Sequence, residues 1–114
     1  MLDVRLYILQ RGTALLLAPL VLVHIVVMIV AVQDGLSAAE ILGRTQGSVG
    51  WMLFYGLFVL AVAVHAAIGL RAIVGETLGR RGPGLAAFAW AAFAVLLALG
   101  LRAVWAVTLS GVGA

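Results

Sequence analysis

The stretch "TALLLAPLVLVHIVVMIVAV", residues 13–32, contains no charged side chain. About 20 apolar residues form a helix long enough to cross the roughly 30 Å of hydrocarbon in a bilayer. Backbone polar groups must be paired inside lipid, so a span is either a helix or a strand of a closed barrel. A barrel strand would alternate apolar and polar residues, whereas this run is continuous. The stretch therefore predicts a transmembrane helix.

Two further apolar runs follow. Residues 45–70 and residues 82–101 contain no charged side chain. Hydrophobic residues make up 66% of the 114 positions, against about 45–50% in soluble domains. We therefore expect an all-α membrane protein with three transmembrane helices in a single domain over residues 1–114. The expected helices are at about residues 12–33, 50–75 and 83–108.

Cysteine and charge usage exclude several functions. The chain has no cysteine, which excludes disulfides, cysteine-ligated zinc and iron–sulfur clusters held by this chain. All seven basic residues are arginines, and the net charge is +3. Because the arginines lie near the ends of the spans and form no basic run, we expect a lipid bilayer around the chain and no nucleic-acid partner.

The arginines also predict an orientation, because arginine-rich connections remain on the cytoplasmic side of a membrane. Most of them flank the first span or surround the second connection: Arg5, Arg11, Arg71, Arg80 and Arg81. We expect the N-terminus and the 75–82 loop in the cytoplasm, and the 33–50 loop and the C-terminus outside. The expected location is a bacterial inner (cytoplasmic) membrane.

The expected outer loop contains a helix-start signal. In "SAAEILGR", Ser37 precedes Glu40 by three positions, which is the spacing of a capping box. We expect a short amphipathic helix from about Ser37 to Leu42, ended by Gly43. It should lie at the outer interface, with Ile41 and Leu42 toward lipid.

One of the two histidines lies at the end of the second apolar run, in "VHAAIGLRAIVGE", residues 64–76. A neutral imidazole inside a membrane needs a polar partner. Haem iron accepts a histidine nitrogen and brings its own apolar macrocycle, and a hydrogen bond to a neighbouring helix meets the same need. These residues leave both interpretations of His65 open. Gly69 lies one turn further along the same face, where a flat ring could lie against the helix.

The other histidine, His24, is expected about 10 Å deeper than His65, by helix rise from Arg11 and Arg71. The two histidines should therefore not hold opposite faces of one haem. For His24 an interhelical hydrogen bond is favoured over a second haem site.

Tyr7 and Arg11 are spaced i, i+4 at the entry to the first span. A guanidinium at that depth can pair with a haem propionate or a quinone head group. The alternative is an interfacial anchor, because tyrosine and arginine are common at membrane edges.

Two segments together resemble signatures of the cytochrome b membrane anchors of succinate dehydrogenase and fumarate reductase. "YILQRGTA" resembles the entry to their first helix, and "HAAIGLRAIVGE" resembles their second-helix signature. The resemblance covers nearly the whole chain. It implies an anchor that binds haem b, helps to form a site for ubiquinone or menaquinone, and receives electrons from a flavoprotein subunit through an iron–sulfur subunit.

Carried over residue by residue, the resemblance makes His65 an axial haem ligand and Gly69 the residue of close approach. Arg11 and Arg71 would face haem propionates or quinone, and Tyr7 occupies the place of a small polar residue of the quinone site. In the two-anchor form of the family each anchor gives one histidine. The resemblance therefore implies a second anchor or a second copy of this chain.

The sequence departs from the family pattern at three positions. Glu76 and Thr77 stand where one anchor type has an aspartate and a quinone-binding tyrosine, and Gln10 takes a place often held by histidine. Three alternatives stay open: a haem-free anchor, an assembly scaffold and a small transporter subunit. A transporter is disfavoured because no carboxylate lies within a span.

Overall fold

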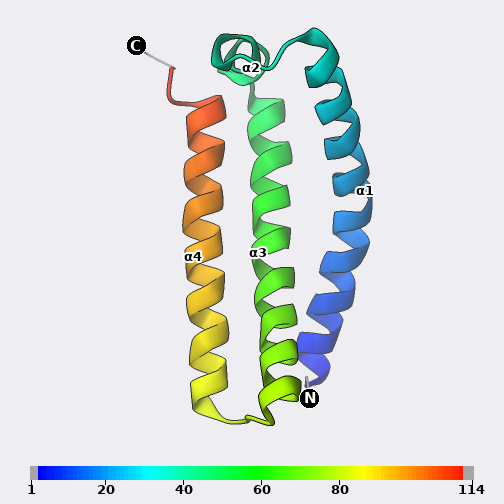
Figure 1. Ribbon diagram of the computed structural model, residues 1–114, viewed down its shortest axis with the longest axis vertical. Coiled ribbons are helices and arrows are strands. Elements are labelled where there is room, and N and C mark those ends of the chain that lie inside the picture. The colour runs from blue at the N-terminus through cyan, green and yellow to red at the C-terminus, as the bar shows by residue number, and fades with distance from the viewer. Residues whose placement is uncertain (1–2, 112–114) are drawn as a thin grey trace.

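The structure, a computed structural model, describes residues 3–111 and consists of helices there. Three helices are long and apolar enough to cross a membrane, which confirms the expected all-α fold with three spans. A short helix follows the first of them along the chain and lies over one end of the other two (Figure 1). The helices are α1 (Val4–Asp34), α2 (Ala38–Thr45), α3 (Val49–Leu78) and α4 (Pro83–Thr108).

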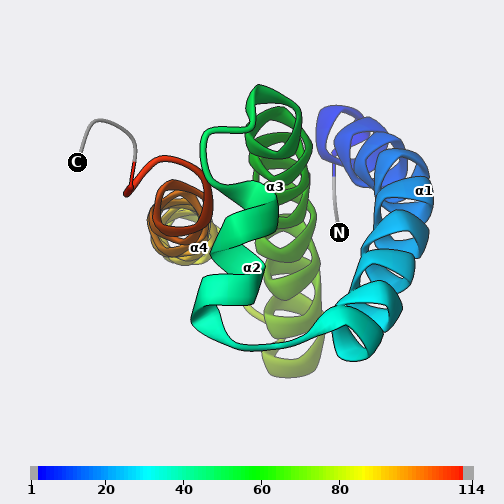
Figure 2. The same ribbon diagram turned by 90° about the horizontal axis from the view of Figure 1, so that it is seen from above.

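Helix α3 is the centre of the bundle. It packs against α4 on one side and α1 on the other, and Figures 1 and 2 show it between them. Helix α1 is curved, whereas α3 and α4 run straight (Figure 1). Pro19 lies inside α1 and cannot donate a backbone hydrogen bond to the preceding turn, which accounts for the curvature.

The buried core is small, and small residues dominate it. The buried apolar side chains are Leu17, Ala61, Ala63, Ala67, Ile68 and Val104. Large apolar residues are exposed along all three long helices. Such a surface suits lipid, where close packing of small residues, rather than exclusion of water, holds helices together.

Helix α1 begins eight residues before the expected position. Asp3 caps it by accepting a hydrogen bond from the Leu6 N–H at 2.9 Å. Hydropathy marks the segment inside lipid, whereas the cap decides where the helix begins, so the helix extends beyond its apolar run. Helix α3 likewise continues to Leu78, three residues past the expected end, and Pro83 starts α4 as expected.

The capping box of α2 is present as expected, but the end of this helix and the position of its apolar face differ from the expectation. Ser37 Oγ accepts from the Glu40 N–H, and the Glu40 carboxylate accepts from the Ser37 N–H. The helix continues through Gly43 to Thr45. Ile41 lines a small cavity between α2, α3 and α4, so its expected lipid-facing position was wrong.

Contacts with the end of α4 explain this difference. The last carbonyl groups of a helix lack partners within the helix. Thr45 Oγ1 donates to the Val107 carbonyl, Gln46 Nε2 donates to the Ala106 carbonyl, and the Gly47 N–H donates to the Thr108 carbonyl. Segment 45–47 therefore closes the end of α4, and this contact holds α2 over the bundle.

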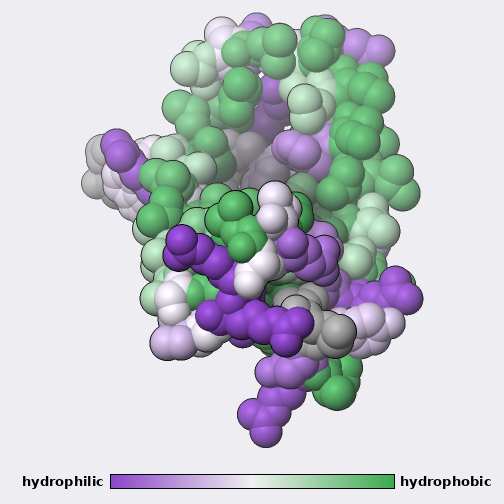
Figure 3. Space-filling view, turned by 60° about the horizontal axis from the view of Figure 1, so that its bottom comes forward, coloured by the Kyte–Doolittle hydropathy of each residue, from purple (hydrophilic) through white to green (hydrophobic). Residues whose placement is uncertain are grey.

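The two ends of the bundle differ in charge. The hairpin end comprises the start of α1, the last turns of α3 and the connection 79–82, and Figure 3 shows hydrophilic side chains gathered there. It carries five arginines and two acidic residues, whereas the α2 end carries two of each. This asymmetry is what the positive-inside prediction uses, and the orientation itself stays a prediction.

Candidate functional site

The candidate site is centred on His65, on the face of α3 that meets α1. His65 Nδ1 lies 3.1 Å from Thr13 Oγ1 of α1, and the ring is half-buried. The other ring nitrogen, Nε2, is not among the buried, unpaired side-chain atoms of residues 3–111. The interhelical hydrogen bond considered for His65 is therefore formed, and it engages only one of the two nitrogens.

Thr13 reaches its own helix as well as His65. Its hydroxyl oxygen lies 2.8 Å from the Leu9 carbonyl oxygen and 3.1 Å from the Gln10 carbonyl oxygen. Threonine in a helix commonly bonds back to the carbonyl three or four residues earlier. A continuous polar chain thus runs from the α1 backbone through Thr13 to His65.

Gly69 lies one turn beyond His65, and its neighbour is Gln10 of α1. A Cβ added at Gly69 would lie 3.4 Å from Gln10 Nε2. A methyl group there would be in van der Waals contact with the end of the flexible glutamine side chain. Gln10 Oε1 is buried and has no hydrogen-bond partner among residues 3–111, which leaves one polar atom beside Gly69 unsatisfied there.

Arg71 lies at an apolar groove nearer the hairpin end. The groove has a volume of about 220 Å³ and lies where α1, α3 and α4 converge. Its lining includes Leu6, Ile68, Trp90 and Phe93. A guanidinium beside an apolar cleft can orient a ligand that has a polar head and an apolar body.

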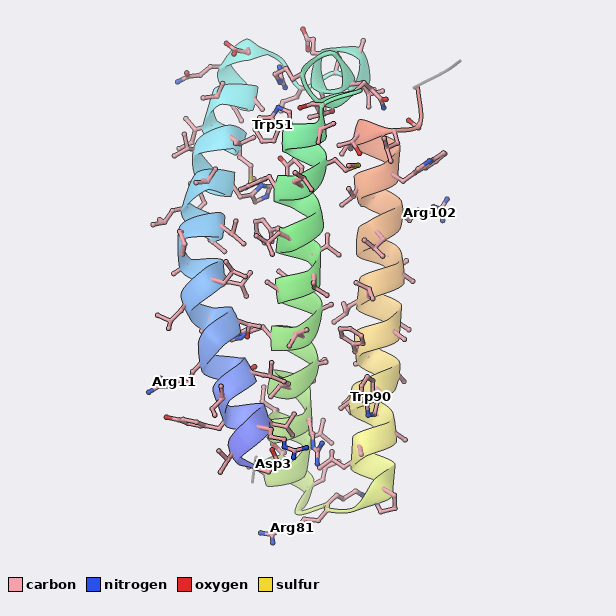
Figure 4. All side chains as sticks on the ribbon, turned by 180° about the vertical axis from the view of Figure 1, so that it is seen from behind. Asp3, Arg11, Trp51, Arg81, Trp90 and Arg102 are labelled. Carbon is pink, nitrogen blue, oxygen red and sulfur yellow. The ribbon has the colours of Figure 1, made fainter. Side chains whose placement is uncertain are left out.

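Arg11 and Tyr7 lie on a different face of α1. Arg11 points away from α3 in Figure 4, and its guanidinium lies 5.6 Å from the centre of the Tyr7 ring. Tyr7 is 54% exposed. The structure therefore groups Arg11 with Tyr7, and it groups Gln10 and Thr13 with His65 and Gly69.

His24 occupies an aromatic environment near the α2 end. Its ring meets the Tyr55 and Phe58 rings edge-on, with centroids 6.0 and 5.3 Å away. His24 Nδ1 is buried and has no hydrogen-bond partner in the described part of the chain. The interhelical hydrogen bond favoured for His24 is therefore not formed by this nitrogen, because α3 presents aromatic rings where a polar partner was expected.

The two histidines are further apart in depth than expected. Thr13 marks the level of His65, and His24 lies eleven residues further along α1, or about 16 Å by helix rise. The direction matches the prediction, which gave about 10 Å. His24 and His65 of one chain therefore cannot provide the two axial ligands of one haem.

A haem fits this donor set at one axial position. Thr13 occupies His65 Nδ1 and leaves Nε2 for a metal. Within residues 3–111, no three His, Cys, Asp or Glu side chains are grouped to hold a metal ion. Of the His65 ring nitrogens, Nε2 is therefore the one that could coordinate a metal.

The fold and these residues define a class: a membrane protein with three apolar spans and with histidines where the first two spans meet. The succinate dehydrogenase/fumarate reductase transmembrane subunit family matches residues 1–103. The chain belongs to this family. Comparisons with curated proteins and with solved structures return no match.

Sequence reasoning did not identify Thr13 and Gln10 as partners of the site. Both occur in "YILQRGTA", the segment that carries the resemblance. Their signal was available, since a polar residue within or beside an apolar span is usually turned toward another helix. Which polar residue of the segment faces α3 depends on the rotation of α1, which the sequence does not give.

Proposed function

We propose that this membrane subunit binds haem b through His65 and helps to form a quinone site, so that electrons pass from an iron–sulfur subunit to quinone. The iron–sulfur subunit would receive them from a flavoprotein that acts on a dicarboxylate. Membership of the family supports the anchor role. The engagement of only one His65 nitrogen by Thr13 carries the haem assignment.

In this proposal His65 Nε2 is the axial ligand. Bound haem would supply a one-electron carrier between the helices. The α1–α3 hydrogen bond holds the imidazole, so ring rotation is restricted before any ligand binds. Gly69, one turn further on, would leave the face of α3 beside His65 free of a side chain. Because His24 is about 16 Å away in depth, a second histidine ligand would have to come from a second anchor or a second copy of this chain.

The quinone site is proposed at the hairpin end. Arg71 would hold the polar head of ubiquinone or menaquinone, or a haem propionate, and the apolar groove beside it would receive the rest of the ring. Arg11 and Tyr7 face outward from α1, where a second anchor would complete the site. Thr77, exposed at the end of α3, stands where one anchor type has a quinone-binding tyrosine. Such a tyrosine would therefore come from a partner.

The hairpin end is also the proposed docking surface for the iron–sulfur subunit. Its excess of arginines supports a cytoplasmic position by the positive-inside rule, and the membrane would be the bacterial inner membrane. Catalytic subunits of this kind work on soluble dicarboxylates, so they need a cytoplasmic surface near the quinone site.

One observation favours a haem-free anchor as the second candidate. His65 already has a polar partner in Thr13, which meets the need of a membrane histidine without iron. A pure assembly scaffold shares this feature. A transporter is disfavoured, because the four acidic residues lie at the ends of the long helices or outside them.

The test is a dithionite-reduced minus oxidised absorption spectrum of the purified complex. We expect a b-type band in the wild type, its loss in His65→Ala, and its retention in His24→Ala, which removes the other histidine. No wild-type band with intact quinone reduction would leave the haem-free anchor. A wild-type complex with neither a b-type band nor quinone reduction would leave a scaffold or a transporter.

A further inference from the structure

We propose that Thr13 is a positioning residue that holds His65 in the tautomer with its proton on Nδ1 and its lone pair on Nε2. Haem ligation by His65 belongs to the proposed function, and the consequence of the tautomer for haem rests on it. The tautomer itself is a property of the protein chain. It follows from the two hydrogen bonds that meet at one hydroxyl group.

The first step concerns the single hydroxyl hydrogen of Thr13. The hydroxyl oxygen has the Leu9 carbonyl at 2.8 Å and His65 Nδ1 at 3.1 Å. A carbonyl oxygen can only accept, so a hydrogen bond to Leu9 uses the threonine hydrogen. The oxygen then has lone pairs left toward His65, and Nδ1 must be the donor. The threonine hydrogen is assigned to the Leu9 carbonyl because that oxygen is nearer to the hydroxyl than His65 Nδ1 is.

The second step concerns the opposite arrangement. If Thr13 donated to Nδ1 instead, the ring proton would be on Nε2, and no residue in 3–111 hydrogen-bonds to that nitrogen in the structure. An N–H without a partner in a membrane costs several kcal/mol. It would also block Nε2 as a metal ligand, because a nitrogen that carries a proton has no free lone pair.

The third step concerns how firmly the position is held. Thr13 lies inside the continuous helix α1, and its hydroxyl bonds back to its own preceding turn. The acceptor therefore has a fixed place relative to α1. His65 lies on α3, so the hydrogen bond fixes the orientation of the imidazole ring relative to α1.

The consequence for bound haem has a definite sign. A ligand histidine that donates its other N–H is more basic and a better electron donor to iron. This favours the oxidised iron, so the bond to Thr13 lowers the reduction potential of haem held by His65. Removing the acceptor should raise the potential. It should also weaken haem binding by about 10- to 100-fold, as loss of such outer partners commonly does.

The experiment compares wild type, Thr13→Val and Thr13→Ser in the assembled complex. Valine keeps the branched shape and removes the hydroxyl, whereas serine keeps the hydroxyl. The first readout is ¹⁵N NMR of labelled histidine on haem-free protein, which reports the protonated ring nitrogen. With only two histidines in the chain, a His24→Gln variant assigns the His65 signals. The second readout is haem content and reduction potential of the loaded complex.

We expect the Nδ1–H form in the wild type and Thr13→Ser, and a shift toward Nε2–H in Thr13→Val. We also expect a higher reduction potential and weaker haem binding in Thr13→Val alone. An Nε2–H tautomer in the wild type would overturn the inference, as would an unchanged tautomer and potential in Thr13→Val. If Thr13→Val does not assemble, the wild-type spectrum alone decides.

The two proposals fail separately. A wild-type complex without a b-type band refutes the haem assignment, yet the NMR spectrum still tests the tautomer. A band that disappears in His65→Ala, together with a Thr13→Val variant identical to wild type, refutes the positioning role of Thr13 and leaves the haem assignment intact.

Discussion

Replacing Gly100 with alanine should push α3 and α4 slightly apart and lower the stability of the protein. The two helices approach so closely at this point that a Cβ added at Gly100 would overlap Val59 Cγ1. It would also lie 3.0 Å from Val59 Cγ2 and 3.2 Å from Val59 Cβ. Carbon atoms prefer separations of about 3.5–4.0 Å, so the helices would have to move apart by roughly 0.5 Å or more.

Val59 has little freedom to relieve the overlap, because a helical valine strongly prefers one side-chain rotamer. Overpacking of this kind costs about 1–3 kcal/mol. Alanine gains up to about 1 kcal/mol over glycine in helix propensity. We therefore expect Gly100→Ala to lower the free energy of unfolding by about 1 kcal/mol, as the balance of these two effects.

Gly56→Ala is the matched control. Gly56 lies inside α3, and a Cβ added there would meet nothing within 4 Å. Gly56→Ala should gain helix propensity without the overlap. The free energies of unfolding of the two variants should therefore differ by about 2 kcal/mol, or roughly 30-fold in the unfolding equilibrium.

The assay is equilibrium unfolding of the purified chain in mixed micelles. The double variant Val59→Ala/Gly100→Ala removes two methyl groups from α3 and adds one to α4. It should recover much of the loss, with a coupling energy of about 1 kcal/mol or more. Equal stability of Gly100→Ala and Gly56→Ala, or a strictly additive double variant, would refute the argument that α3 and α4 are in close contact at Gly100.

Further predictions concern α2. The hydrogen bonds from the backbone and side chain of Ser37 lower the pKa of Glu40 below its ordinary value. A lowered folded pKa gives stability that is present above the unfolded pKa and is lost as the pH falls through the folded pKa. Acid titration should therefore fray α2, as followed by its backbone chemical shifts. Glu40→Gln should remove this dependence and keep the cap, and an identical titration in both proteins would contradict the assignment. Thr45→Val should cost about 1 kcal/mol by leaving the Val107 carbonyl unpaired, and hydrogen exchange of α2 should accelerate; unchanged exchange would show that this contact does not hold α2.

Much of the candidate site could be predicted from the sequence. A histidine in an apolar run needs a partner wherever it lies, so His65 was identifiable from composition and position alone. Its partner was not, because Gln10, Arg11 and Thr13 follow one another closely on α1 and point in different directions around the helix. Arg11 faces outward beside Tyr7, whereas Thr13 reaches His65.

The α2 helix gives the same lesson at shorter range. Ser37 and Glu40 predicted its start, because a capping box is made by residues three apart. Its end and its apolar face depended on Thr45, which donates to a carbonyl 62 positions further along the chain. No local pattern contains that partner.

The sequence by itself determined that this protein is a three-helix membrane protein, because a bilayer demands long apolar runs and paired backbone groups, and both are local properties of the chain. It also determined the family, through residues 1–103. Only the tertiary structure decided which side chains meet. In lipid, water does not drive one helix face inward, so the rotation and spacing of the helices follow from close packing and a few interhelical hydrogen bonds. The contact of Gly100 with Val59 and the bond between Thr13 and His65 are of that kind.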